Sequence, residues 1–111
     1  MKDNFFELVY TIVAQVPRGR VTTYGAVAKF LNKPRGSRAV GWAMRQCSNE
    51  KVPCHRVIYS DGTVGGYGVE GVSRKIALLR TEGIIVSEDR IDLGCYFFSR
   101  FTWKPVSFRE K

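Results

Sequence analysis

The sequence predicts a mainly α-helical domain with a small β element. Apolar residues recur at helical spacing in several separate stretches, whereas a strand-and-turn pattern occurs only around residues 57–62. The chain has 111 residues, 44% of them hydrophobic, which fits one domain with a modest core. We expect this single domain to span residues 1–111, with its core at about 3–86 and a tail at 87–111 whose packing the pattern does not predict.

The first predicted helix covers residues 3–16, where apolar side chains follow a helical period: Phe5, Phe6, Leu8, Val9, Ile12, Val13 and Val16. Asp3 or Asn4 is its expected N-cap, and Pro17 with Gly19 ends it. Acidic residues within the apolar stretch and the lack of a small-residue cleavage site argue against a signal peptide. No run of about 18 apolar residues occurs, which argues against a transmembrane helix and against a membrane as partner.

Two further helices follow, joined by a tight turn that contains Gly and Pro. Thr22 or Thr23 is the expected cap of the second helix, which stops before the segment Asn-Lys-Pro-Arg-Gly. Ser37 is the expected N-cap of the third helix, which runs to about Cys47. Two short helices in this arrangement, the second rich in Arg and small residues, indicate a helix-turn-helix.

The small residues of the third helix have two interpretations. Ala39, Gly41 and Ala43 make a helix face thin enough to approach a nucleic-acid groove, or they allow close helix–helix packing instead. Arg38 and Arg45 add positive charge to this helix. The whole chain has 18 Lys and Arg against 10 Asp and Glu, a net charge of +8. This excess favours a polyanionic partner, with a basic surface kept for solubility as the alternative.

The second half of the chain contains the β element and one more helix. Residues 57–59 are the predicted strand, followed by a Ser-Asp-Gly turn and a glycine-rich loop. Residues 73–83 are a basic amphipathic helix with Gly83 as its C-cap and three inward residues, Ile76, Leu78 and Leu79. Three aromatic residues of the tail are expected to complete the core, with a partner-protein surface as the alternative: Phe97, Phe98 and Trp103.

One cysteine lies directly before the only histidine of the chain. Pro53 precedes Cys54 and His55, and Arg56 follows them. A thiol becomes a strong nucleophile when a nearby base or cation favours its thiolate form. Neighbours on an extended strand point to opposite faces, so either the backbone turns at Pro53 or a water connects the two side chains. Glu82 is a candidate for orienting the histidine. The alternative is a buried structural cysteine beside an ordinary histidine.

The cysteine count also bears on the setting of the protein. Three cysteines, with no secretion signal, argue for free thiols in a reducing, intracellular environment: Cys47, Cys54 and Cys95. No metal site is predicted, because there is no C-x-x-C pair and a single histidine. We expect a cytoplasmic, nucleoid-associated protein, or a nuclear one in a eukaryote.

Five stretches, in this order, resemble a known family: VTTYGAVA, SRAVGWAMR, VPCHRVI, SDGTVGGYG and RKIALLRTEG. The chain is similar, over about residues 5–86, to the C-terminal DNA-binding domain of the methylated-DNA–protein-cysteine methyltransferases, also called O6-alkylguanine-DNA alkyltransferases. The resemblance implies a winged-helix-like helix-turn-helix fold. It also implies repair of double-stranded DNA containing O6-alkylguanine, in which the base is flipped out of the duplex and its alkyl group moves irreversibly to a cysteine, with no cofactor.

The resemblance also implies roles for individual residues. Cys54 is the alkyl acceptor, His55 is a base acting through water, and Glu82 orients His55. Arg38 fills the space left by the flipped base, and Tyr24 rotates the 3′ phosphate. The base pocket is formed by Tyr24, Met44, Val57, Tyr67 and Gly68. Further DNA contacts come from Thr23, Ser37, Ala39, Gly41 and Arg45.

The sequence departs from the family pattern at several places. Cys47 stands where relatives usually carry an asparagine, although Asn49 follows closely, and Gly68 replaces a serine. We expect no counterpart of the N-terminal domain that many relatives have. The alternative function is therefore that of the alkyltransferase-like proteins, which flip alkylated bases without efficient transfer and signal to excision-repair proteins. A small cysteine hydrolase is a third possibility. We expect a monomer.

Overall fold

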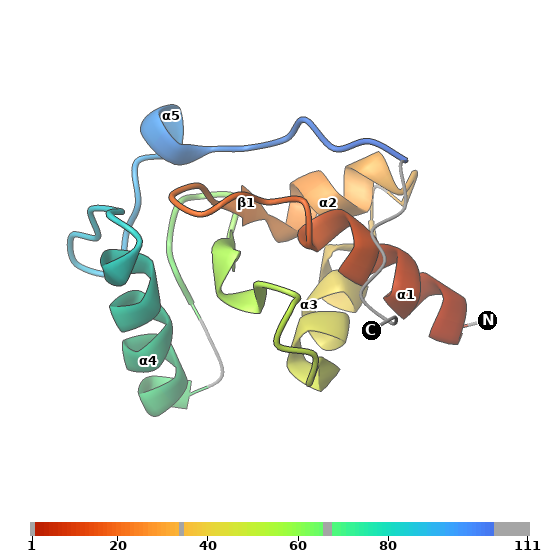
Figure 1. The fold of residues 1–111 in the computed structure, drawn as a ribbon, viewed down its shortest axis with the longest axis horizontal. Coiled ribbons are helices and arrows are strands. Elements are labelled where there is room, and N and C mark those ends of the chain that lie inside the picture. The colour runs from red at the N-terminus through yellow and green to blue at the C-terminus, as the bar shows by residue number, and fades with distance from the viewer. Residues whose placement is uncertain (1, 34, 66–67, 104–111) are drawn as a thin grey trace.

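The computed structural model describes residues 2–33, 35–65 and 68–103. In chain order its elements are α1 (Lys2–Val13), β1 (Thr22–Thr23), α2 (Tyr24–Phe30), α3 (Ser37–Gln46), the 3₁₀ turn η1 (Cys54–Arg56), β2 (Val57–Ile58), α4 (Gly68–Thr81) and α5 (Leu93–Tyr96). The predicted class, mainly helical with a small β element, is confirmed. Helices α1, α2 and α3 pack together on one side of the molecule and α4 lies on the other, with the strands between them (Figure 1).

Helix α1 extends nearly as predicted, with different ends. It begins at Lys2, so Asp3 and Asn4 lie inside the helix and neither is its cap. Regular helix stops at Val13, but the chain continues in tightened turns to Val16, whose N–H donates to the carbonyl of Val13 at 3.0 Å. The predicted end near Pro17 is therefore correct for the helical path of the chain.

Helices α2 and α3 begin in different ways. The hydroxyl of Thr23 accepts a hydrogen bond from the N–H of Ala26 at 3.0 Å, which confirms a threonine cap. The expected Ser37 cap of α3 is wrong: Gly36 is the N-cap, and its carbonyl accepts the first helical bond from Val40. A side chain at Gly36 would come within 2.9 Å of Cβ of Lys33, so the crowded turn favours a glycine at this cap.

The β element is a short parallel pair. β1 and β2 align Thr22 with Val57 and Thr23 with Ile58, and the predicted strand at 57–59 ends one residue early. All four paired residues are buried. Because the strands are parallel and η1 immediately precedes β2, this pairing places the Cys54 turn beside the segment that leads into β1.

Helix α4 begins earlier than predicted and ends as predicted. Gly83, with φ of 87°, follows the helix, and the N–H of Ile84 donates back to the carbonyl of Leu79 at 3.2 Å. This is the hydrogen-bond pattern of a glycine-terminated helix. Leu79 is fully buried, but the expectation for Leu78 is wrong, since its side chain is 43% exposed. One helical residue adds about 100° of rotation, so Leu78 and Leu79 face different directions.

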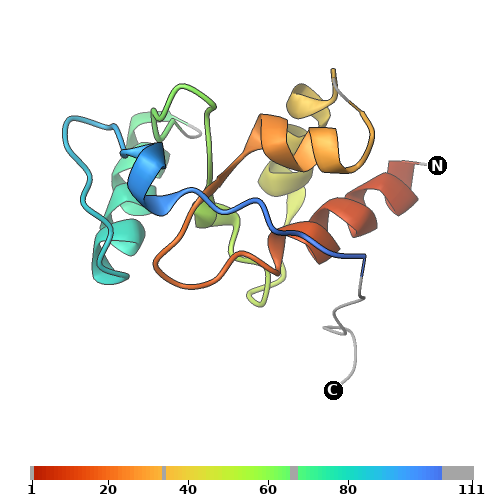
Figure 2. The same ribbon diagram turned by 90° about the horizontal axis from the view of Figure 1, so that it is seen from above.

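Two hydrophobic clusters form the core. The larger lies among α1, α2 and α3 and includes Val57 and Phe101, and the smaller lies between α4, Ile58 and the segment after α4. The tail runs across the chain segment between α1 and β1, where the N–H of Phe98 donates to the carbonyl of Val21 at 2.8 Å (Figure 2). Phe98 contacts the larger cluster, whereas Phe97 and Trp103 are exposed, so the tail completes the core only in part.

Candidate active site

A tight turn presents Cys54 and His55. The N–H of Cys54 donates to the carbonyl of Val52 at 2.8 Å, and the N–H of Arg56 donates to the carbonyl of Pro53 at 2.9 Å. The expectation that the backbone turns at Pro53 is thereby confirmed. Cys54 and His55 consequently do not lie on opposite faces of a strand.

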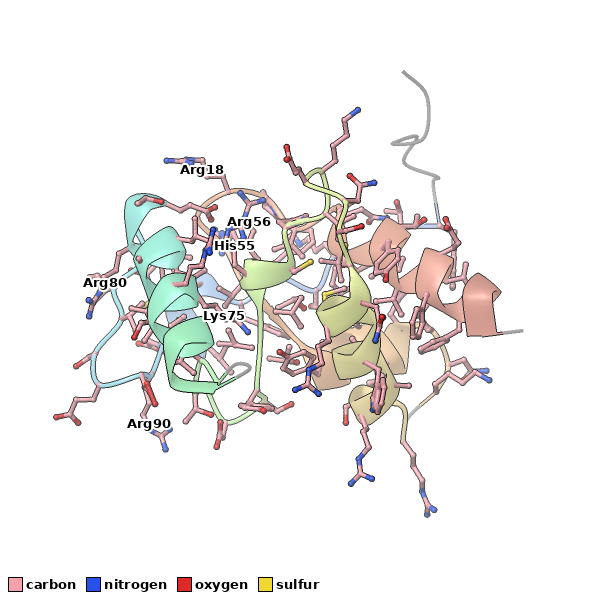
Figure 3. The ribbon with its side chains drawn as sticks, turned by 90° about the horizontal axis from the view of Figure 1, so that it is seen from below. Arg18, His55, Arg56, Lys75, Arg80 and Arg90 are labelled. Carbon is pink, nitrogen blue, oxygen red and sulfur yellow. The ribbon has the colours of Figure 1, made fainter. Side chains whose placement is uncertain are left out.

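The side chains of His55 and Arg56, the two residues that follow Cys54, both bind the carboxylate of Glu82, which lies just beyond the end of α4. Its Oε2 lies 2.7 Å from Nε2 of His55, as expected from the sequence. Arg56 donates to the same carboxylate through Nε at 2.9 Å and Nη2 at 2.8 Å, a bidentate pair that the sequence did not indicate. Figure 3 shows His55 and Arg56 close together on η1, near α4. Arg56 therefore forms its ion pair with Glu82 and not with a thiolate at Cys54.

The Glu82 carboxylate is ionised at neutral pH. Burial by itself would raise the pKa of Glu82, but hydrogen bonds from Arg56, His55 and the N–H of Gly19 outweigh it and lower the pKa to about 2. Arg56 also donates through Nη1 to the carbonyl of Val16 at 2.8 Å. Glu82 and Arg56 thus link η1, the end of α4 and the segment after α1, and the carboxylate holds the imidazole of His55 in one position.

The Cys54 thiol is protonated at rest. Burial raises its pKa to about 12, with further contributions from Cys47, which is close enough to share a hydrogen bond with it. The Cys54 Sγ lies 3.5 Å from the carbonyl of Val52. Cys47, at the usual asparagine position, is thus an immediate neighbour of the candidate nucleophile. A base is required before this thiol can react.

A buried lysine, which the sequence pattern did not indicate, lies close enough to Cys54 for the two side chains to interact electrostatically. Lys75 of α4 is 8% exposed, and its Nζ lies 3.3 Å from the hydroxyl of Tyr24 and 5.5 Å from the centre of the Tyr24 ring. Burial lowers the pKa of Lys75 to about 8, partly offset by Cys54. Its position one helical turn before buried Leu79 was the available sign that it faces inward. In Figure 3, Lys75 points from α4 toward the interior.

The predicted base-binding residues lie in different parts of the structure. Tyr24, Met44 and Val57 are buried in the cluster against which Cys54 packs, and their contact with a base stays a prediction. Gly68 is the first residue of α4. Tyr67 lies outside the described residues.

The predicted DNA-binding residues lie on or beside α3. Ser37, Arg38 and Arg45 are exposed, whereas Thr23 is buried as the cap of α2. Ala39 and Ala43 lie four residues apart on one side of α3, where Ala43 is fully buried in the core, so Gly41 does not share their face. Gly41 and Arg38 instead line a cavity of about 460 Å³ between α3 and the turn after β2.

Cys47, Cys54 and Cys95 are free thiols, as predicted. Among the described residues, no group of three or more His, Cys, Asp and Glu side chains is arranged to hold a metal ion. None of the helices, over the same residues, has the length and apolar character needed to cross a membrane.

The fold and the site together define a helix-turn-helix domain that carries a cysteine next to a carboxylate-held histidine. Residues 4–84 match the family described as "6-O-methylguanine DNA methyltransferase, DNA binding domain". The chain belongs to this family, which confirms the resemblance seen in the sequence.

Three similar proteins carry names that describe different functions. A bifunctional methyltransferase/endonuclease of Picrophilus torridus is 40% identical over 99 residues, covering 88% of this chain but only 33% of that protein. Alkyltransferase-like protein 1 of Schizosaccharomyces pombe is 34% identical over 105 residues, covering 93% of this chain and 97% of that protein. The DNA base-flipping protein of Escherichia coli is 40% identical over 97 residues, covering 86% and 74%.

A solved structure shares the fold. The crystal structure of S. pombe Atl1 in complex with damaged DNA containing O6-carboxymethylguanine is 34% identical, with a TM-score of 0.80, covering 86% of this chain and 95% of that one. The helix-turn-helix architecture of this chain is therefore that of a family member seen bound to damaged DNA.

Proposed function

We propose that the protein repairs O6-alkylguanine in double-stranded DNA by flipping the base out of the duplex and transferring its alkyl group to Cys54. The observation that carries the proposal is the turn η1, which places Cys54 next to a histidine held at 2.7 Å by Glu82. A histidine fixed by an ionised carboxylate is the usual partner of a nucleophilic cysteine.

The reaction needs one proton acceptor and one leaving group. The Cys54 thiol gives its proton, through a water, to His55, and the imidazolium that forms is stabilised by Glu82. The sulfur then attacks the alkyl carbon, a new S–C bond forms, and the bond between that carbon and O6 breaks with its electron pair staying on the guanine. A proton returns to the guanine, and the thioether on Cys54 is stable. Each protein molecule thus acts once.

DNA binding is assigned to α3 and its surroundings. Arg38 and Arg45 are exposed on this helix, and the chain carries a net charge of +8. The S. pombe structure with damaged DNA supports a DNA-binding role for the shared fold. Phosphate contacts of this kind depend on salt and carry little sequence information.

Recognition without transfer is the second candidate function. It is favoured by the raised pKa of Cys54 and by the names of the relatives from S. pombe and E. coli, an alkyltransferase-like protein and a base-flipping protein. In that case the flipped base would be held and displayed to excision-repair proteins. Cys54, the residue that transfer requires, is present here and favours the first candidate.

Intact-protein mass spectrometry distinguishes the two candidates. The protein is mixed with a duplex that contains one O6-methylguanine, and the modified peptide is then mapped. Transfer predicts a gain of one methylene mass on the peptide holding Cys54, and no gain in the Cys54→Ala variant. Tight, selective binding of the same duplex with no mass gain would instead establish a damage sensor.

A further inference from the structure

An aromatic and basic cavity lies between α3, the start of α2 and the turn after β2. It has a volume of about 460 Å³ and is bounded by the rings of Tyr24, Trp42 and Tyr59 and by the side chains of Arg38 and Arg45. Cys54 is not among the residues that line it. Tyr24 stands between the two: its ring borders the cavity, while its hydroxyl contacts Lys75, which interacts with Cys54.

Tyr59 is an exposed ring with a well-defined position. It is 48% exposed, yet its ring centre lies 5.3 Å from that of Tyr24, at an interplanar angle of 50°. The chain also approaches this ring closely at Gly65, where any side chain would overlap the Tyr59 ring. The N–H of Tyr59 also donates to the carbonyl of Thr63 at 3.1 Å. The backbone turn and two packing neighbours therefore hold this ring in place.

Trp42 supplies a second exposed ring from α3. Its side chain is 54% exposed, and it lies one helical turn from both Arg38 and Arg45, on the same face of the helix. Large aromatic rings next to arginines are the combination that binds unstacked nucleotides, because any base can stack on a ring while guanidinium groups neutralise the phosphates.

We propose that this cavity is a stacking site for a nucleotide that has left the double helix, with Trp42 and Tyr59 as its aromatic walls. The inference rests on the proposed function, which requires such a nucleotide, and adds a place, apart from Cys54, where the nucleotide is held. Arg45 contributes positive charge at the neighbouring phosphate, while Arg38 borders the cavity and fills the space that the nucleotide leaves in the duplex. Since stacking does not depend on base identity, this site accepts any base, and discrimination of alkylated guanine occurs beyond Tyr24.

Intrinsic fluorescence tests the Trp42 wall directly, because the chain has two tryptophans, Trp42 and Trp103. In the Trp103→Phe variant Trp42 is the only source of tryptophan emission. Titration with a duplex carrying one unpaired nucleotide should quench this emission, and more strongly than an intact duplex of equal length. The matched Trp42→Phe variant reports from Trp103, which packs on Phe30, and should show no such difference. Equal emission changes with both duplexes would overturn the site.

Substitutions at Tyr59 test the second wall. Tyr59→Ala should weaken binding of the duplex with the unpaired nucleotide by on the order of tenfold, whereas Tyr59→Phe keeps the ring and the affinity. Binding of the intact duplex should change much less. Unchanged affinity in a folded Tyr59→Ala protein, or an equal loss in both variants, would contradict the proposal.

The experiments can overturn the proposed stacking site and the proposed repair reaction independently. If Cys54 becomes methylated but Trp42 emission is quenched equally by the duplex with the unpaired nucleotide and by the intact duplex, the stacking site alone is overturned. A protein that quenches Trp42 selectively, but never gains a methyl group from O6-methylguanine, would keep the stacking site and overturn transfer.

Discussion

Oε2 of Glu82 lies 2.7 Å from Nε2 of His55, although the two residues are 27 positions apart in the sequence. The same oxygen accepts from Nη2 of Arg56 at 2.8 Å, and the Glu82 side chain is only 5% exposed. One buried carboxylate therefore both orients the candidate base and joins η1 to α4. Structural and chemical effects of this residue must be measured together.

Replacing Glu82 should affect stability and reactivity at once. Glu82→Gln keeps the shape of the side chain but leaves the Arg56 guanidinium without its charged partner, and we expect a loss of about 3 kcal/mol in the free energy of unfolding. We also expect methyl transfer at least tenfold slower, since the imidazolium loses its stabilising charge. Urea unfolding and single-turnover kinetics measure the two effects. Glu50→Gln, an exposed loop change, is the matched control and should alter neither.

Glu82 also predicts the stability of the protein in acid. Its pKa falls from about 4.5 to about 2 on folding, so the unfolded chain binds more protons between these values. The contribution of Glu82 is therefore complete above about pH 5 and is lost as the pH falls toward 2. The stability difference between wild type and Glu82→Gln, measured by urea unfolding from pH 6 to pH 2.5, should shrink steadily. A difference independent of pH would show that the carboxylate is not responsible.

Lys75 predicts a second rise of stability with pH, in the alkaline range. Burial lowers its pKa from 10.5 to about 8, so the unfolded chain holds this proton while the native state releases it. Wild type should gain stability relative to Lys75→Met as the pH rises from about 8 to 10.5. Lys51→Met removes the same charge at an exposed position and provides the comparison. A flat difference for Lys75→Met would mean that the buried amine does not titrate as described.

Cys47 should restrain the reactivity of Cys54. Burial is the main cause of the raised pKa of Cys54, and Cys47 adds to it by charge repulsion and by a hydrogen bond. Cys47→Ala should lower that pKa and speed alkylation of Cys54 by iodoacetamide at pH 8 several-fold, since one pKa unit changes the thiolate fraction about tenfold. Both proteins carry Cys95→Ser, which removes the exposed thiol. Slower alkylation in Cys47→Ala would indicate that Cys47 activates its neighbour instead.

DNA affinity should depend on α3 and on salt. Arg38→Ala should weaken binding of the methylated duplex about tenfold and slow transfer, because the arginine that replaces the flipped base is lost. Wild-type affinity should fall steeply with increasing salt, since it rests on phosphate contacts. Arg100→Ala removes the same charge from the segment after α5, away from α3 (Figures 1 and 2), and serves as the control. Equal effects of the two substitutions would indicate general charge attraction only.

The features that were predictable from the sequence are those set by neighbouring residues. Helical periodicity placed the helices, and short-range chemistry identified the Thr23 cap, the Gly83 ending and the turn at Pro53. The Ser37 cap and the inward side chain of Leu78 were wrong, since crowding at Gly36 and the rotation of α4 decided them.

The adjacency of Cys54 and His55, and their membership of a known pattern of motifs, could be read without coordinates. Tertiary structure alone decided that Arg56 shares Glu82 with His55, that Lys75 is buried under Tyr24, and that Cys47 lies against Cys54. These are contacts across loops and between helices, and their energies depend on burial. A local pattern records which chemical groups are available, whereas packing decides which of them meet and how far water is excluded when they do.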